Sequence, residues 1–162
     1  MPVEIIESTG AMFVLWGRPN PIDVARLSER LHAAVARNAG PILYVTRVPA
    51  GAPAPDASTR KHLNAAMPLT AECCSSYHVV MEGTGFGAAV KRGVLLSLFQ
   101  LTQRRGLFHV HANCDDLLRH VSTEEAATVR NLLNRARSQG LLDGHPLASL
   151  APRGKADLRK TG

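Results

Sequence analysis

Short apolar runs and turn residues alternate over the first forty residues and predict two strands followed by a helix. Residues 3–6 and 11–16 are runs of the kind that form strands, and a Ser-Thr-Gly turn separates them. The helix should begin where an asparagine cap precedes proline and aspartate, and should end at Gly40 and Pro41. The residues at its start are Asn20, Pro21 and Asp23, and the apolar stripe at helical spacing is Val24, Leu27, Leu31, Ala34 and Val35.

The middle of the chain repeats the alternation of strand and helix. Residues 42–45 are a short β-branched run that predicts a buried strand, and the proline-rich residues 49–55 should be extended without being helix or strand. A helix then starts at a cap, either Asp56 or Ser58, and continues to about residue 72. Pro68 lies inside this helix and should kink or split it, because proline removes a backbone hydrogen bond.

Strand and helix patterns continue to residue 140. Residues 77–81 predict a strand, residues 88–101 an apolar helix after a glycine-rich turn, and residues 107–112 the last strand. Two further helices follow, and their expected caps are Asn113 for the first and Ser122 with Glu125, a capping-box pair, for the second. The last helix should end at Gly140, and its apolar stripe is Val129, Leu132, Leu133 and Ala136.

The element order is therefore β-β-α-β-α-β-α-β-α-α, which predicts an α/β fold. Strands that alternate with helices imply a mostly parallel or mixed sheet, here of about five strands, with helices on its faces. The length of 162 residues fits one domain. We expect that domain to occupy residues 1–144 and residues 145–162 to form a flexible basic tail.

Charge and composition narrow the classes of function. The formal net charge is +6, but residues 151–162 hold four basic residues and one acidic residue, so half of the excess lies in the tail. The body is only mildly basic. Aromatic residues make up 4% of the chain, which leaves few rings for stacking on the bases of single-stranded nucleic acid. We therefore expect no nucleic-acid partner.

Cysteine usage and hydropathy predict a compartment. Cys73 and Cys74 are adjacent and Cys114 stands alone, so the three cysteines do not form a disulfide framework, as is typical of a reducing compartment. No signal-peptide pattern opens the chain, and no apolar run reaches the roughly 18 residues that a membrane span needs. The sequence predicts a cytoplasmic protein without a membrane span, in which the Cys73–Cys74 pair fills the core.

The element order, length and turn positions over residues 3 to about 140 resemble those of the STAS domain, the fold of anti-sigma-factor antagonists. The Ala- and Arg-rich composition is similar to that of small STAS-like proteins of high-GC bacteria. STAS domains are generally not enzymes. They bind partner proteins, often through the segment after the third strand and the N-terminus of the second helix. The resemblance therefore implies a non-enzymatic regulatory or scaffolding module that needs no cofactor.

The stretch that matches this partner-binding segment begins at Asp56. In the antagonist branch the helix starts with a phosphorylatable Ser or Thr that typically follows an Asp, and the nearest match here is Ser58, with Thr59 next. The usual Asp-Ser-Ser/Thr-Gly run is missing. A phosphate would lie at a helix N-terminus beside Arg60 and Lys61, which both favour negative charge. Alternatively, Ser58 serves only as a helix cap.

A second hypothesis is a module that binds a small anionic ligand or a lipid at the glycine turn. Gly83, Gly85 and Gly87 follow a strand and precede Lys91 and Arg92, an order that can cradle a phosphate. The turn resembles the relaxed dinucleotide fingerprint, but it follows the fourth strand and lacks both a suitably placed acidic residue and a Walker-type lysine. The alternative is a tight strand-to-helix joint.

A third hypothesis is a metal- or thiol-dependent enzyme. His109 and His111 are two apart on a strand and so point to one face, with His78 on the preceding strand, and three imidazoles suit zinc. Their spacing shows no clear carboxylate partner, and a solvated edge strand is the alternative.

The thiol version of this hypothesis rests on Cys114, which is close in sequence to His111. Cys114 lies at a helix start, which should lower its thiol pKa. An incidental cysteine is the alternative there.

The helix predicted at residues 88–101 has more apolar surface than a single stripe needs. It is either the central helix against the sheet or a helix that buries its second side in a homodimer.

Overall fold

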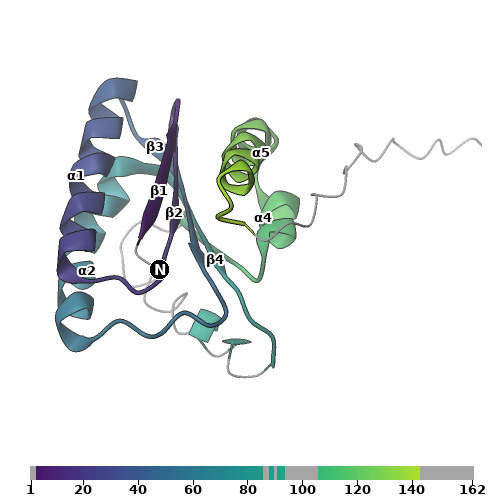
Figure 1. Cartoon of the computed structure of the whole chain (residues 1–162). Coiled ribbons are helices and arrows are strands. Elements are labelled where there is room, and N and C mark those ends of the chain that lie inside the picture. The colour runs from purple at the N-terminus through teal and green to yellow at the C-terminus, as the bar shows by residue number, and fades with distance from the viewer. Residues whose placement is uncertain (1–2, 86–87, 90, 94–105, 143–162) are drawn as a thin grey trace, which may run out of the picture.

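The computed structural model describes residues 3–85, 88–89, 91–93 and 106–142, which build one five-stranded mixed sheet (Figure 1). The strands lie in the order β1-β2-β3-β4-β5. The first pair is antiparallel and the other three pairs are parallel. The predicted α/β class is confirmed. The strands are β1 (Glu4–Ser8), β2 (Ala11–Leu15), β3 (Ile42–Val48), β4 (Cys74–Met81) and β5 (Phe108–His111).

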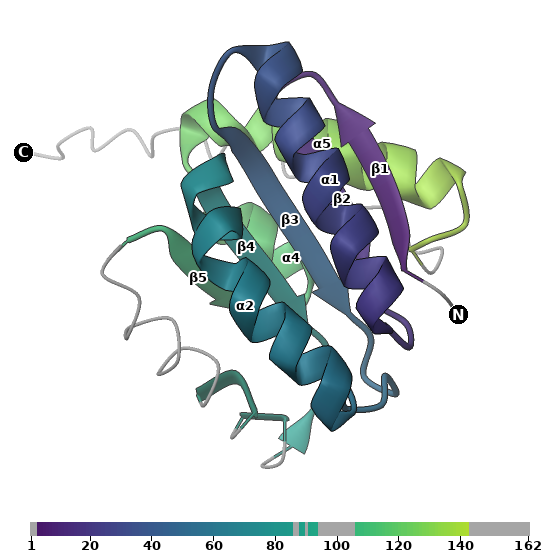
Figure 2. The ribbon, with the colours of Figure 1, turned by 90° about the vertical axis from the view of Figure 1, so that its left-hand side faces the viewer.

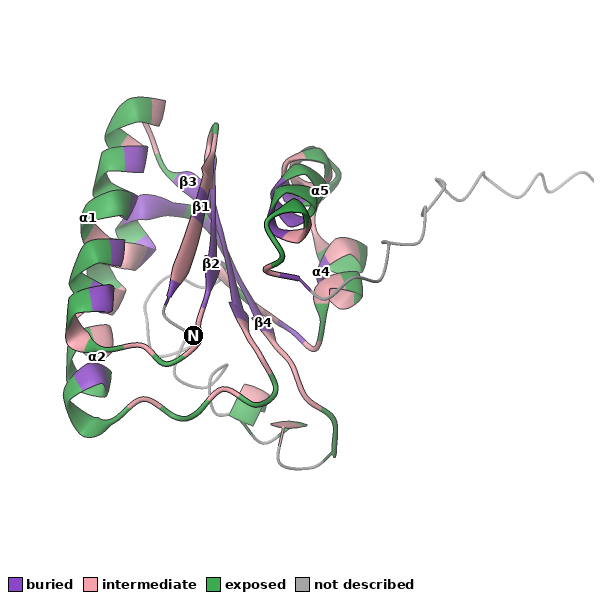
Figure 3. Cartoon of the chain, in the orientation of Figure 1, coloured by how far each residue is buried: buried purple, intermediate pink, exposed green. Residues whose placement is uncertain are grey.

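Helices cover both faces of this sheet (Figures 1 and 2). On one face lie α1 (Pro21–Asn38) and α2 (Ala57–Cys73); on the other lie α4 (Cys114–His120) and α5 (Thr123–Ser138). Successive side chains of a strand point to opposite faces, so the sheet separates two hydrophobic clusters, and burial is concentrated on the strands and the inward sides of the helices (Figure 3). The α1 and α2 face includes an aromatic ladder across three neighbouring strands, Tyr44, Tyr77 and Phe108.

The predicted helix starts are confirmed. The Asn20 side chain accepts a hydrogen bond from the backbone of Asp23, whose carboxylate accepts one in return from the backbone of Asn20. Asn113 accepts from the backbone of Asp116 at the start of α4, and Ser122 caps α5. The predicted stripe of α5, from Val129 to Ala136, is fully buried against β1 and β2. Local sequence therefore sets where these helices begin and which side of them faces the sheet.

Two predicted helix features differ in the structure. The left-handed residue that ends α1 is Ala39, with φ of 53°, rather than Gly40, whose N–H then bonds to the carbonyl of Val35 and closes the last turn. Pro68 lies within α2 and does not split it. The residues that follow Pro68 include Ala71 and Cys73, which are buried against the core, and this packing accompanies the continued helix.

The third and fourth strands extend beyond the predicted runs. β3 continues through Arg47, and β4 begins three residues earlier than residue 77. Arg47 is buried because its guanidinium makes two hydrogen bonds to the Glu82 carboxylate, at 2.7 and 2.9 Å, and a third to the carbonyl of Leu141 at 2.7 Å. A positive charge in an apolar run normally marks the end of a strand, and here tertiary partners reverse that preference.

Two predicted segments fall largely or wholly outside the described residues. These are the apolar helix at residues 88–101, with its homodimer surface, and the tail at residues 145–162. Within the part of the chain that the structure describes, no helix has the length and hydropathy needed to span a bilayer.

Candidate functional site

The parallel strands bring their carboxyl ends to one edge of the sheet, which we call the carboxyl edge. The loops after β2, β3 and β4 meet there: the backbone N–H of Trp16 bonds to the carbonyl of Arg47, and that of Glu82 bonds to the carbonyl of Val48. A Cβ added to Gly83 would lie 3.9 Å from the Cβ of Ala50. The structure therefore brings together the proline-rich loop and the glycine turn, the two regions that the sequence singled out separately.

The first turn of α2 presents its charged and hydroxyl side chains to solvent. Asp56, not Ser58, is the N-cap, and its carboxylate accepts the backbone N–H of Thr59 at 2.7 Å. That hydrogen bond lowers the pKa of Asp56. Ser58, Arg60 and Lys61 are exposed, whereas Thr59 is fully buried. Of the two predicted phosphorylation candidates, only Ser58 is therefore accessible to another protein.

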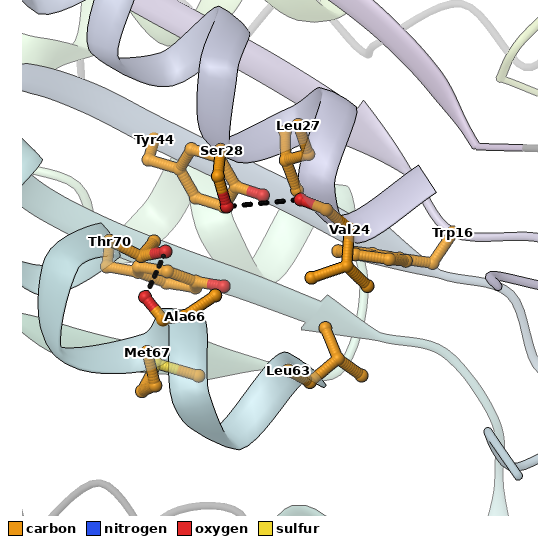
Figure 4. Close-up of a pocket in the computed structure, with 10 residues that line it drawn as sticks. Trp16, Val24, Leu27, Ser28, Tyr44, Leu63, Ala66, Met67 and Thr70 are labelled. Carbon is orange, nitrogen blue, oxygen red and sulfur yellow. Dashed lines mark hydrogen bonds between the residues drawn. The ribbon is translucent and has the colours of Figure 1, made fainter. Parts of the chain in front are cut away.

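An exposed isoleucine at the start of α1 was missed by the sequence analysis. Ile22, the second residue of α1, is 78% exposed. Val24 of α1 and Leu63 of α2 line the same crevice between the two helices (Figure 4), and both helices begin at the carboxyl edge because each follows a parallel strand. The signal in the sequence was an apolar residue at a helix start that does not fit the apolar stripe.

The glycine turn is held by an arginine. Gly83 and Gly85 have positive φ of 131° and 81°, and a Cβ on Gly83 would lie only 3.1 Å from that of Ala88, so close packing requires glycine there. Arg92 donates to the carbonyls of Met81 and Gly83 at 3.1 and 3.2 Å, and its charge is thereby directed into the turn. Lys91 is exposed, and Gly87 lies outside the described residues. Anion binding at this turn stays a prediction, and the contacts of Arg92 favour the strand-to-helix joint.

The crevice between α1 and α2 is small. It has a volume of about 20 Å³, which is room for roughly one water molecule. Ser28 and Thr70 at its sides bond back to carbonyls of their own helices (Figure 4). In this conformation the crevice cannot hold a nucleotide or a lipid chain. Its other lining residues are Trp16, Val24, Leu27, Tyr44, Leu63, Ala66, Met67 and Tyr77.

The three histidines that the sequence placed on one face lie together on the face covered by α4 and α5. His78 is paired with His109 across β4 and β5, with ring centroids 4.9 Å apart, and its centroid is 5.3 Å from that of His111. Nδ1 of His78 lies 3.1 Å from Nε2 of His111, so one ring donates a hydrogen bond to the other. His78 and His111 are buried, whereas His109 is exposed as the solvated-edge alternative predicted.

A carboxylate and a fourth histidine complete this group, which corrects the expectation that no carboxylate partner is present. Asp116 Oδ2 lies 3.9 Å from Nδ1 of His111, and Asp116 Oδ1 lies 3.2 Å from Nδ1 of His120. Ligand atoms of His111, Asp116 and His120 all lie within 4.8 Å of one another. Asp116 and His120 are four residues apart and share one side of α4, a spacing that was visible in the sequence. Their proximity to His111 depends on the turn from β5 into α4.

The buried histidines are neutral at physiological pH. Burial lowers the pKa of His78 and of His111 to about 4, with neighbouring histidines adding to the effect. The pKa of Asp116 is lowered by the hydrogen bond from the backbone of Ala112 and then by the surrounding basic side chains. The group therefore combines two neutral buried imidazoles with an ionised carboxylate, the states in which imidazole and carboxylate bind metal ions.

The cysteines do not provide an activated thiol. Burial raises the pKa of Cys114 to about 11, so the expectation that the helix start would lower it is wrong. The seven-residue helix offers a modest dipole, and desolvation of the thiolate outweighs it. Burial also raises the pKa of Cys73. Cys73 and Cys74 are both buried and belong to the core cluster under α1 and α2, as predicted.

No protein-family model, curated protein sequence or solved structure matches this chain.

Proposed function

We propose that the domain is a non-enzymatic protein-interaction module and that its partner binds at the carboxyl edge, on the surface formed by residues 49–61 and the start of α1. The observation that carries the proposal is that exposed Arg60 and Lys61 of α2 and exposed Ile22 of α1 lie near the starts of two helices that both begin at the carboxyl edge. Exposed cations and an exposed apolar side chain on the same edge of the sheet fit a partner that offers both acidic and apolar residues.

The resemblance to STAS domains supports the same surface. The five strands run in sequential order with the first pair antiparallel, and α2 follows the third strand. The resemblance assigns partner binding to the segment after the third strand and the N-terminus of the second helix, which here is residues 49–61.

We extend the proposal to regulation of binding by phosphorylation. Phosphate on the exposed Ser58 would neutralise Arg60 and Lys61 and so weaken binding of an acidic partner.

The proposal predicts that reversing two charges removes the partner. The double variant Arg60→Glu with Lys61→Glu should reduce capture of the partner from a lysate of the native host by tenfold or more, about 1.4 kcal/mol. Both side chains are exposed, so its thermal unfolding and circular dichroism should match those of the wild type. Quantitative mass spectrometry of the captured proteins measures the ratio.

A matched variant tests whether the position of the charges matters. Arg130→Glu with Arg135→Glu changes the net charge equally, on exposed positions of α5 across the sheet. It should retain the partner. If both double variants lose the partner equally, binding follows net charge alone and the proposed surface is wrong; if the Arg60 and Lys61 variant retains it, the proposal fails outright.

A further inference from the structure

We propose that this domain also binds a divalent transition-metal ion, of the class of Zn²⁺, through His111, Asp116 and His120. This site lies on the α4 and α5 face, away from Arg60 and Lys61, and is independent of the proposed partner surface. Two imidazoles and one carboxylate form a ligand set that suits zinc and its neighbours in the first transition series.

The spacing of the ligand atoms is close to that of a coordinated ion. In tetrahedral zinc sites the ligand atoms are about 3.3 Å apart, as follows from bonds of roughly 2.0 to 2.1 Å. Here the carboxylate oxygens of Asp116 lie 3.9 Å from Nδ1 of His111 and 3.2 Å from Nδ1 of His120. These two distances use different oxygens of Asp116; with one ligand atom from each residue the atoms lie within 4.8 Å of one another, so a contraction of up to about 1.5 Å closes the site. Three protein ligands leave a fourth position for water or another ligand.

The rigid members of the site are already oriented. His111 ends β5, and its ring is only 5% exposed. Because its Nε2 faces Nδ1 of His78 at 3.1 Å, binding of metal through Nδ1 leaves the Nε2 proton to be donated to His78. Metal-bound histidines commonly donate their second ring N–H to a neighbour in this way. Asp116 is fixed by the backbone N–H of Ala112, which donates to Oδ2 at 3.0 Å.

The exposed member of the site, His120, provides the route of entry. The His120 side chain is 65% exposed, and Nδ1 bonds to the carbonyl of Asp116 at 2.8 Å. An exposed ring can turn and exchange that hydrogen bond for the metal. Arg119, 61% exposed, lies 3.4 Å from Oδ1 of Asp116 and competes with the ion for this oxygen. An exposed ion pair of this kind is worth little and yields to coordination.

The test uses the full chain, freed of metal with a chelator, and titrated with Zn²⁺ by calorimetry. One equivalent should bind, and Co²⁺ in its place should give the visible absorption of a four- or five-coordinate ion. His120→Ala and Asp116→Asn should each weaken Zn²⁺ binding by tenfold or more, because the first removes a ligand and the second replaces an anionic oxygen with a neutral amide. The asparagine still offers an oxygen to the backbone of Ala112, so α4 should keep its start.

A control variant at a comparable exposed histidine distinguishes Zn²⁺ binding at this site from Zn²⁺ binding to surface histidines in general. His32 on α1 is exposed and bonds through Nδ1 to the carbonyl four residues earlier, as His120 does. His32→Ala should bind Zn²⁺ like the wild type. The proposal is overturned if the wild type takes up no Zn²⁺, or if it does so with an affinity that His120→Ala and Asp116→Asn leave unchanged, since the ion then lies elsewhere on the chain.

Discussion

Replacing Arg47 by methionine is expected to lower the free energy of unfolding by about 3 kcal/mol. The guanidinium is buried, with its side chain 8% exposed, and it makes two hydrogen bonds to Glu82 and one to the carbonyl of Leu141. Its removal leaves the Glu82 carboxylate, three-quarters buried, without this cation, and releases the segment after α5 from β3. Denaturant unfolding followed by circular dichroism measures the loss.

The double variant Arg47→Met with Glu82→Met tests the cause. If the loss comes from a carboxylate left without its partner, removing that carboxylate as well should recover at least half of it, because buried ion pairs are often replaced by apolar residues at little cost. If the double variant is less stable than the single variant by a further similar amount, the two side chains act separately. The account of Arg47 as the partner that buries Glu82 would then be wrong.

Acidification below pH 6.5 should destabilise the domain through its two buried histidines. The pKa values of His78 and His111 fall from the usual 6.5 to about 4 on folding, so the unfolded chain binds more protons between these values. Stability is therefore fully present above pH 6.5 and is lost as the pH falls towards 4. Each histidine contributes at most roughly 3 kcal/mol to the free energy of unfolding above pH 6.5. The two together contribute less than twice that amount, because their rings share a hydrogen bond.

Free energies of unfolding at pH 7 and pH 5, measured with a chelator present, test this expectation. The titratable groups that face the two rings are His109, His120, Asp116 and Glu125, and the pKa values of the two carboxyls are lowered. His78→Leu should flatten the pH dependence, whereas the exposed His62→Gln on α2 should leave it unchanged. Equal slopes in wild type and His78→Leu would show that burial of His78 does not set the acid sensitivity.

Much of the fold follows from local sequence, for identifiable reasons. The cap residues Asn20 and Asp23 satisfy backbone groups within three residues of themselves, so their role is visible without tertiary information. The stripe from Val129 to Ala136 is apolar at helical spacing and is buried accordingly. The mixed, mostly parallel sheet of five strands was also predicted, because strands alternate with helices along the chain.

The features that local sequence did not predict depend on partners far along the chain. Arg47 lies in a strand only because Glu82, 35 residues later, neutralises it. His78 and His111 are 33 residues apart and meet through the register of β4 and β5. Cys114 follows a helix cap, but packing of the surrounding elements raises its pKa. Burial is a tertiary property, so neither the charge pairing nor the pKa shifts could be derived from residue spacing.

The partner surface is tested most directly by backbone hydrogen exchange of the domain with and without the captured partner. The account predicts slower exchange at residues 49–61 and in the first turn of α1 when the partner is bound, with the exposed side of α5 unchanged. Slower exchange confined to α4 and α5, with residues 49–61 exchanging as in the free domain, would contradict it.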